Sequence, residues 1–323
     1  MKFRDIETQV RQCPLCNSAE SRLVFSDINR REGLQIPFSV VECRDCSMRY
    51  LNPVPDTKLI SQYYREGVVD PVRQDRIAVS PTKNKPGVPV GHSIFSMVNG
   101  IFRGHPHDWP NEEGDGRNIL DFGCHDGEKL VHWYRNGWEV AGVDLNEPAI
   151  SFAMKRFPEA RFWCGDLLKM EIPCRFDVIR ADNVLEHLSD PISYLAALVR
   201  LLKPGGFLRV FVPNGRALSV SMLGRYSYVY WLPFHLNFFD PKTLRLAMER
   251  AGLASTECKV FSPVGSWMHS QRQLLLSPGF DLRPISLLDR AIRNSWWLNY
   301  PGETVAQWIG LGEEVIGTGR TIP

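Results

Sequence analysis

Four cysteines in two close pairs are the clearest chemical feature of this sequence. Each pair is a Cys-x-x-Cys segment, and the four residues are Cys13, Cys16, Cys43 and Cys46. Thiolates at this spacing can turn toward one ion, and two such pairs complete the tetrahedral four-sulfur shell of structural zinc. A redox pair and two disulfides are the alternatives. Because four cysteines leave no ligand position open, we expect the zinc to be structural rather than catalytic.

A glycine-rich turn between two apolar segments predicts a site for a nucleoside-bearing cofactor. A strand expected at 118–122 leads into the turn, and the next strand ends at Asp144. Gly123 and Gly127 let the backbone approach a ligand. Asp144, about 20 residues further on, can accept hydrogen bonds from ribose hydroxyls. His125 in the middle of the turn disfavours a dinucleotide pyrophosphate, and a plain strand-to-helix connection is the alternative.

The segments around this turn predict an α/β protein with a doubly wound parallel sheet. From residue 117 onward, apolar strand segments alternate with amphipathic helical segments, which is typical of parallel sheets covered by helices. We expect strands at 118–122, 138–144, 160–164, 176–181, 207–212, 255–262 and 313–320. Ligands of such sheets bind beyond the carboxyl ends of the strands, where the glycine turn is expected.

The sequence divides into three expected parts. Residues 1–55 form a small zinc ribbon, residues 56–116 form a linker and lid of helix and loop, and residues 117–323 form the main domain. Two insertions are expected within the main domain: an aromatic segment at 213–240, which can form a wall of an acceptor site, and a helical segment at 271–310.

Composition and charge narrow the class of partner. The chain has 323 residues, of which 44% are hydrophobic and 23% charged, as in globular proteins. A formal net charge of +2 makes a nucleic-acid partner unlikely. No apolar run long enough for a transmembrane helix and no apolar signal segment is found, so we expect a cytoplasmic protein. Trp296 and Trp297 could contact a membrane surface, with packing on the sheet as the alternative.

Several segments occur in an order that resembles the class I S-adenosylmethionine-dependent methyltransferases, over about residues 117 to 320. They are Leu120–Gly127, Gly142–Asp144, Cys164–Asp166, Phe176–Pro191 and Leu202–Gly206. The resemblance implies a seven-stranded Rossmann-like sheet and S-adenosyl-L-methionine as cofactor, with Asp166 near the adenine amino group. The cofactor-binding residues that we expect are Asp121, Gly123, His125, Gly127, Asp144, Asp166 and Asn183.

The cysteine pairs, followed by Pro53 and Pro55, resemble a subgroup of these enzymes with an N-terminal zinc ribbon. This subgroup includes deoxysugar C-methyltransferases and enzymes similar to those of surface-polysaccharide pathways. Its glycine motif often carries a polar residue where this chain has His125. Phe234 replaces the glutamate of the subgroup's Glu-His pair, and the additional lobe of the sugar C-methyltransferases has no counterpart here. These departures favour methylation of oxygen, on a sugar or a related hydroxyl.

Two histidines are candidate bases that could take the proton of an acceptor hydroxyl. His235 lies in the aromatic segment where the resemblance puts the acceptor, and an ordinary histidine titrates near neutral pH. His187, beside Glu186, follows the fourth strand. For His235 the alternative is a structural role, in which the ring donates a hydrogen bond to a backbone carbonyl.

The leading functional hypothesis is a methyltransferase that acts on a small molecule or glycan. An RNA base methyltransferase with a zinc module is the second hypothesis, supported by basic residues near the ribbon and opposed by the near-neutral net charge. The third is a catalytically inactive protein that binds the cofactor and acts through its zinc ribbon.

Overall fold

The computed structural model describes residues 7–28, 37–65, 117–263, 267, 270–271, 274 and 296–322. Most of the expected linker at 56–116 and most of the expected helical insertion at 271–310 lie outside the described residues. The same holds for the side chains of Trp296 and Trp297, for which a membrane contact and packing on the sheet are the two alternatives.

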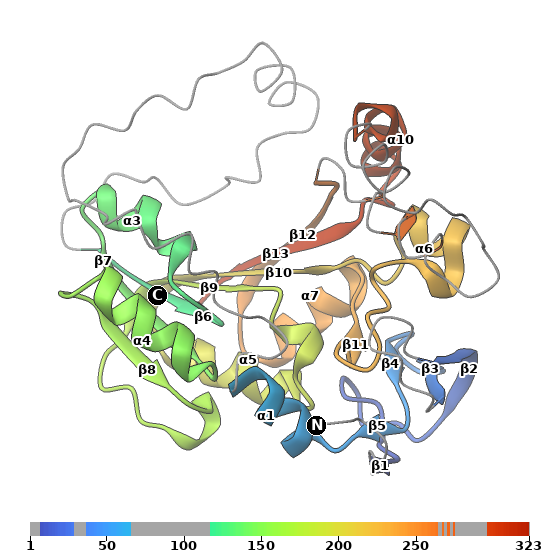
Figure 1. The fold of residues 1–323 in the computed structure, drawn as a ribbon, viewed down its shortest axis with the longest axis horizontal. Helices are drawn as coiled ribbons and strands as arrows, with labels where there is room; N and C mark the ends of the chain where they lie inside the picture. Colours follow the sequence, from blue (N-terminus) through green and yellow to red (C-terminus); the bar gives the residue numbers. More distant parts are fainter. Residues whose placement is uncertain are drawn as a thin grey trace.

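The centre of the molecule is one sheet, which has seven strands in the described part of the chain (Figure 1). In spatial order these are β12 (Ala254–Phe261), β13 (Glu314–Arg320), β10 (Leu202–Pro213), β9 (Phe176–Asp182), β6 (Asn118–Phe122), β7 (Glu139–Asp144) and β8 (Arg161–Cys164). The five strands from β10 to β8 are parallel, and β13 is antiparallel to both of its neighbours. The predicted α/β fold with a seven-stranded, doubly wound sheet is confirmed.

Helices cover both faces of this sheet. Residues of α5 (Pro191–Arg200) and α7 (Pro241–Arg250) share one hydrophobic cluster with Leu120 and Phe122 of β6. Residues of α3 (Val131–Arg135) and α4 (Glu147–Arg156) share another cluster with Ile119, the neighbour of Leu120 on the same strand. Successive strand residues point to opposite faces, so Ile119 and Leu120 of β6 are buried on opposite sides of the sheet, as in a strand covered by helices on both faces.

Three of the helices begin with the same type of N-cap. Asn146, Asp190 and Asp240 cap α4, α5 and α7, and each side chain accepts a hydrogen bond from a backbone N–H in the first turn. A proline in that turn needs no hydrogen-bond partner for its nitrogen, so all three helices start at a defined residue.

The N-terminal part of the chain forms a second, smaller sheet. Its strands are β2 (Ser21–Ile28), β3 (Pro37–Cys43) and β4 (Arg49–Leu51), and it is extended by β11 (Asn237–Phe238) from the aromatic segment. β1 (Thr8–Gln9) pairs with β5 (Val54–Pro55), and α1 (Thr57–Arg65) follows. Because β11 pairs antiparallel with β4, the ribbon and the aromatic segment share one hydrogen-bonded sheet. The remaining helices are α6 (Leu218–Leu223) and α10 (Trp296–Trp308).

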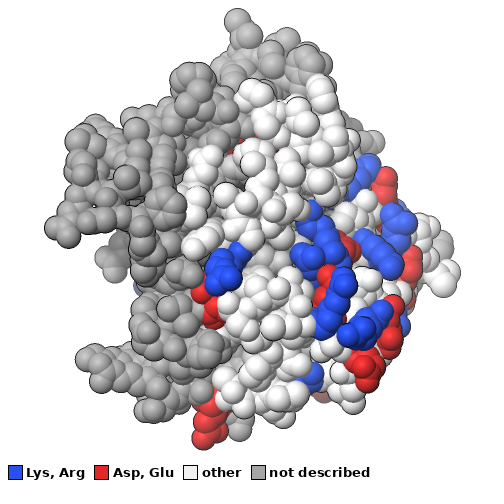
Figure 2. Space-filling model, turned by 90° about the vertical axis from the view of Figure 1, so that its right-hand side faces the viewer, with Lys and Arg blue, Asp and Glu red and all other residues white. Residues whose placement is uncertain are grey.

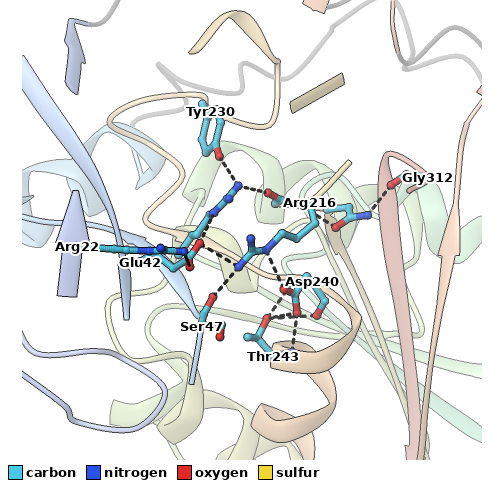
Figure 3. A network of polar contacts seen from close by, with 11 residues as sticks. Arg22, Glu42, Ser47, Arg216, Tyr230, Asp240, Thr243 and Gly312 are labelled. Atoms are coloured by element: carbon cyan, nitrogen blue, oxygen red, sulfur yellow. Dashed lines mark hydrogen bonds and ion pairs between the residues drawn. The ribbon is translucent and has the colours of Figure 1, made fainter. Parts of the chain in front are cut away.

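A buried carboxylate reinforces this junction (Figure 3). Glu42 of β3 is 5% exposed and accepts hydrogen bonds from Arg22 at 2.6 Å and Arg49 at 2.9 Å. Arg216, which follows β10, lies 3.0 Å from the same carboxylate and also contacts Asp240 at 3.3 Å. Arg49 in turn donates to the carbonyl oxygen of Gly215 at 3.0 Å. Charged groups from both parts of the chain therefore meet at one point.

Charged side chains on the surface are mixed in sign. On the face shown in Figure 2, Lys and Arg side chains lie among Asp and Glu side chains, in keeping with the net charge of +2. In the part of the chain that the structure describes, no helix combines the length and apolar character that crossing a membrane requires.

Replacing the central carboxylate should destabilise the fold. We expect Glu42→Ala to lower the free energy of unfolding by about 2–3 kcal/mol, because it removes the carboxylate that pairs with the largely buried Arg49 and leaves Arg216 with Asp240 alone. Arg22→Ala is the matched control: the Arg22 side chain is 63% exposed, so its loss should cost under about 1 kcal/mol. Urea unfolding of both variants tests this, and equal stabilities of Glu42→Ala and the unsubstituted protein would contradict it.

The effect of Glu42→Ala should also depend on pH. Burial opposes ionisation of Glu42, but the hydrogen bonds from Arg22 and Arg49 outweigh it and lower the pKa of this carboxyl. A lowered folded-state pKa contributes stability that is fully present above the ordinary glutamate pKa and is lost as the pH falls through the lowered pKa. The stability gap between Glu42→Ala and the unsubstituted protein should therefore narrow below about pH 4.

Candidate functional site

The predicted cofactor turn lies where the order of the strands reverses. From β6 the chain moves outward to β7 and β8, then returns to β9 on the other side of β6. Loops that follow β6 and β9 therefore diverge at the carboxyl edge of the sheet, where ligands of doubly wound sheets bind. The glycine turn follows β6, and Asn183 follows β9.

Asp144, at the end of β7, orders the backbone of this turn. Its Oδ2 atom accepts a hydrogen bond from the backbone nitrogen of His125 at 2.8 Å, and its Oδ1 atom accepts one from Asn146 at 2.8 Å. Burial raises the pKa of Asp144 above its ordinary value. A carboxylate oxygen can accept more than one hydrogen bond, so Asp144 can hold the turn and still accept from a ribose hydroxyl.

The two glycines of the turn are needed for contacts within the protein. Gly123 has a φ of +77°, and a Cβ atom there would lie 2.3 Å from Cγ2 of Val184, which follows β9. Gly127 has a φ of +73°, and its Cβ would lie 2.8 Å from the Phe157 ring. Sequence reasoning assigned both glycines to the approach of a ligand. The structure adds that they bring the turn against the loop after β9 and against the end of α4.

A buried set of charges lies beneath the turn. Asp121 of β6 is 1% exposed, and burial raises its pKa to about 6. Arg180 of β9 lies 3.4 Å from Asp121 and also donates a hydrogen bond to Asp182. Within the described residues, one carboxylate oxygen of Asp121 (Oδ2) and one of Asp182 (Oδ1) are buried without a hydrogen-bond donor. Sequence reasoning missed Arg180, although an arginine inside an apolar strand was a visible signal.

Asp166, after β8, is bonded to a residue that sequence reasoning also missed. Its Oδ1 atom accepts a hydrogen bond from the hydroxyl of Tyr194 at 2.7 Å, and the Tyr194 ring stacks on Phe122 with ring centroids 5.8 Å apart. Burial opposes ionisation of Asp166, but the Tyr194 hydrogen bond and nearby Lys169 lower its pKa overall. An ionised acceptor beside an aromatic ring suits an adenine, which has an exocyclic amino donor and a flat face.

These features fit S-adenosyl-L-methionine. The buried, donor-free oxygens of Asp121 and Asp182 can receive an ammonium group or hydroxyls, and Asp144 and Asp166 offer further acceptors along the same edge. The seven predicted cofactor residues all lie at or beneath this edge, on β6 and β7 or in the loops that follow β6, β8 and β9: Asp121, Gly123, His125, Gly127, Asp144, Asp166 and Asn183. Their individual contacts with the cofactor stay predictions.

The two predicted catalytic histidines lie side by side. The ring centroids of His187 and His235 are 4.8 Å apart, and Glu186 is the neighbour of His187 in the chain. His235 is 6% exposed, and its Nδ1 atom lies 2.7 Å from the carbonyl oxygen of Val229. A structural histidine that donates to a backbone carbonyl would make this contact. The contact involves only one of the two ring nitrogens of His235. Burial lowers the pKa of His187 to about 4, so this ring is neutral at neutral pH.

The aromatic segment contributes more to the core than to an open wall. Tyr230, Phe234, Phe238 and Phe239 are all buried. Trp231 is only half-buried and packs edge-on to His235, with ring centroids 5.6 Å apart. Among the described aromatic residues after β10, Tyr226, Tyr228 and Trp231 retain partial exposure.

The four predicted metal ligands also come together. The Sγ atoms of Cys13 and Cys46 are 3.5 Å apart, as are those of Cys16 and Cys43, and all four lie within 4.8 Å of one another. Zinc–sulfur bonds of about 2.3 Å in a tetrahedron imply sulfur–sulfur distances of about 3.8 Å. The four thiols therefore fit a zinc ion.

The two cysteine pairs have the same backbone turn. Asn17, just after the first pair, has a φ of 59°, and its backbone nitrogen donates to the Cys13 carbonyl at 2.9 Å. Ser47, just after the second pair, has a φ of 67° and donates to the Cys43 carbonyl at 3.1 Å. Both turns expose their two thiols on one side, as a shared ion requires.

Comparison with known proteins adds the following findings. The family described as "Methyltransferase domain" matches residues 92–257. A ubiquinone biosynthesis O-methyltransferase of Cereibacter sphaeroides is 32% identical over 175 residues, which are 50% of this chain and 70% of that protein. The same-named protein of Ruegeria pomeroyi is 32% identical over 49% of this chain and 70% of its own length. A crystal structure of an S-adenosylmethionine-dependent methyltransferase from Mesorhizobium loti aligns over 66% of this chain and 93% of that chain, with 17% identity and a TM-score of 0.45.

The glycine turn can be tested with two substitutions of the same kind. Gly123→Ala should lower the free energy of unfolding by about 2–5 kcal/mol, because it adds both a strained φ and a clash with Val184. The shifted turn should also weaken S-adenosylmethionine binding by about tenfold or more, equivalent to about 1.4 kcal/mol.

Gly137→Ala is the matched control for Gly123→Ala. Gly137 also has a positive φ, of 83°, but a Cβ there would have no atom within 4 Å. We expect backbone strain to lower the free energy of unfolding by about 1 kcal/mol. The affinity for the cofactor should be unchanged. Urea unfolding and calorimetric titration with the cofactor measure both effects. Equal cofactor affinities of the two variants would show that the turn does not hold the cofactor.

Proposed function

The chain belongs to the methyltransferase-domain family and is a class I S-adenosylmethionine-dependent methyltransferase, and on this premise we propose that it methylates a hydroxyl oxygen of a small molecule or glycan. The observation that carries this proposal is the cluster of Glu186, His187 and His235 at the carboxyl edge of the sheet that also holds the predicted cofactor residues. The relatives at 32% identity, which are named O-methyltransferases, support oxygen as the methylated atom.

Transfer of a methyl group to a hydroxyl makes two demands on the protein. When bound, S-adenosyl-L-methionine supplies a methyl group made electrophilic by its sulfonium. The chain must hold the acceptor oxygen in line with the breaking carbon–sulfur bond, and it must let the hydroxyl proton leave. Asp144 and Asp166 serve the first demand by fixing the nucleoside, and the donor-free oxygen of Asp121 is suited to the ammonium group.

The second demand falls on the histidine pair. A backbone carbonyl can only accept a hydrogen bond, so a neutral His235 carries its proton on Nδ1, facing Val229, and a lone pair on Nε2. Nδ1 of His187 also lies 2.9 Å from a backbone carbonyl oxygen, that of Phe234, and equally close to the Tyr64 hydroxyl, but a pKa of about 4 makes His187 a weak base. We therefore propose His235, rather than His187, as the base that takes the proton of the acceptor hydroxyl.

We also assign zinc to Cys13, Cys16, Cys43 and Cys46. With four thiolate ligands the ion has no position for a substrate, so its contribution is to hold the two turns of the ribbon together. The ribbon sheet continues into β11, only two residues beyond His235. Zinc therefore supports the acceptor side from a distance.

Methyl transfer should depend on His235. We expect His235→Gln to lower turnover by about 100-fold or more while S-adenosylmethionine binds with unchanged affinity. His132→Gln, at an exposed position on α3, is the control and should keep full turnover. The assay measures S-adenosylhomocysteine formation with nucleotide sugars, phenolic hydroxyl compounds and RNA as acceptors. Full turnover of His235→Gln would remove its role, and methylation of RNA alone would overturn the proposed function.

Loss of two thiols should remove the zinc. We expect the double variant Cys13→Ser, Cys16→Ser to contain about one zinc ion per chain less than the unsubstituted protein, and to unfold at a lower temperature. Cys258→Ser, outside the ribbon, should change neither the zinc content nor the unfolding temperature. Elemental analysis after dialysis measures the content, and an unchanged zinc content in the double variant would contradict the assignment.

A further inference from the structure

Three potential metal ligands converge a second time, away from the cysteines. Glu186, His187 and His235 each offer one ligand atom, and these atoms lie within 4.8 Å of one another. Glu186 and His187 belong to the short helix η4 (Leu185–His187) after β9, and His235 precedes β11. The two segments are bonded directly, since the Leu236 nitrogen donates to the Glu186 carbonyl at 2.6 Å. The three side chains therefore hold fixed relative positions.

Glu186 is the member of this group that requires an explanation. It is 1% exposed, and within the described residues neither of its carboxylate oxygens has a hydrogen-bond partner. The Nε2 atom of His187, a neutral ring at neutral pH, lies 3.8 Å from Oε1, which is beyond hydrogen-bond distance. A buried carboxylate without donors costs several kcal/mol unless it takes up a proton, is paired with a cation or coordinates a metal.

The histidines present the right atoms to such a metal. His235 donates from Nδ1 to the Val229 carbonyl at 2.7 Å, and Nδ1 of His187 lies 2.9 Å from both the Phe234 carbonyl oxygen and the Tyr64 hydroxyl. Metal-binding histidines commonly donate one ring N–H to a backbone carbonyl or carboxylate, which fixes the tautomer and leaves the other nitrogen to bind the ion. In both rings this other nitrogen is Nε2.

The surrounding charges favour a cation. Asp182, two residues after Arg180 on β9, and Glu314, on β13, both lie close enough to Glu186 to raise the cost of its negative charge. The ammonium group of Lys129 lies 3.8 Å from Asp182. It offsets the negative charges of Asp182 and Glu314 only in part, because the Lys129 side chain is 49% exposed to solvent. A divalent ion beside Glu186 would relieve this crowding of carboxylates.

We infer that Glu186, His187 and His235 bind a divalent first-row transition-metal ion, separate from the zinc of the cysteine ribbon. Two imidazole nitrogens and one carboxylate oxygen suit manganese, iron, cobalt or zinc, whereas magnesium and calcium prefer oxygen ligands throughout. Three protein ligands leave positions open, as in metal sites that bind a substrate.

The open positions suggest a use for the ion, and this part of the inference rests on the proposed function. A hydroxyl oxygen bound to the ion would lose its proton to solvent more readily, and the resulting oxygen would attack the methyl carbon as the carbon–sulfur bond breaks. The ion would then perform the activation assigned above to His235, and His235 would act by holding the ion.

Manganese distinguishes the two metal sites, because Mn²⁺ favours nitrogen and oxygen ligands over thiolates. We expect the full-length protein, with its ribbon zinc retained, to bind about one Mn²⁺ per chain in a titration followed by electron paramagnetic resonance. Glu186→Gln and His235→Gln should each weaken this binding by about tenfold or more. His132→Gln, at the exposed position, should bind Mn²⁺ as the unsubstituted protein does.

A second measurement needs no substitution and so does not depend on how the variants fold. Pulsed electron paramagnetic resonance of the Mn²⁺-loaded protein should detect coupling to imidazole nitrogen. Absence of Mn²⁺ binding, absence of nitrogen coupling, or unchanged affinity in folded Glu186→Gln and His235→Gln would each overturn the inference. Neither measurement uses an acceptor, so metal binding without hydroxyl methylation would refute the proposed function and leave the metal site standing.

Discussion

The pairing of β6 with both β7 and β9 is the constraint on which the rest of the structure depends. It places β6 at the point where the strand order reverses, so that the loops after β6 and β9 leave the same edge in opposite directions. Gly123 can lie against Val184 only because these two loops start side by side. Glu186 and His187 follow β9 as Asn183 does, whereas His235 comes from the segment between β10 and β11.

Much of the fold and part of the site could be predicted from the sequence, because both depend on the order and spacing of residues that are close together in the chain. The expected strand at 118–122 coincides with β6, and the cysteine spacing indicated four ligands that do converge. What the sequence could not show are pairings between distant residues. The Tyr194–Asp166 hydrogen bond and the Arg180–Asp121 contact depend on which strands become neighbours. The burial of Glu186 depends in the same way on the aromatic segment that covers it, far along the chain.

The acceptor side shows how a polar cluster is kept in an apolar setting. His187 and His235 lie among Tyr64, Trp231 and Phe234, whose rings exclude water from the imidazoles. Each imidazole contacts a backbone carbonyl through Nδ1, and the Tyr64 hydroxyl also lies 2.9 Å from Nδ1 of His187. Orientation by the backbone leaves little rotational freedom to lose when a ligand binds, which is the usual benefit of a preorganised site.

The strand β11 has a consequence for how the molecule could respond to its surroundings. Its hydrogen bonds to β4 continue a sheet whose far end is closed by four thiols, and the Leu51 nitrogen bonds the Leu236 carbonyl at 2.9 Å, next to His235. Thiolates are the groups in this chain that oxidants and competing soft metals attack first. Damage to the ribbon would therefore reach the main chain beside His235 through direct strand pairing, whereas β6, β7 and β8 belong to the other sheet.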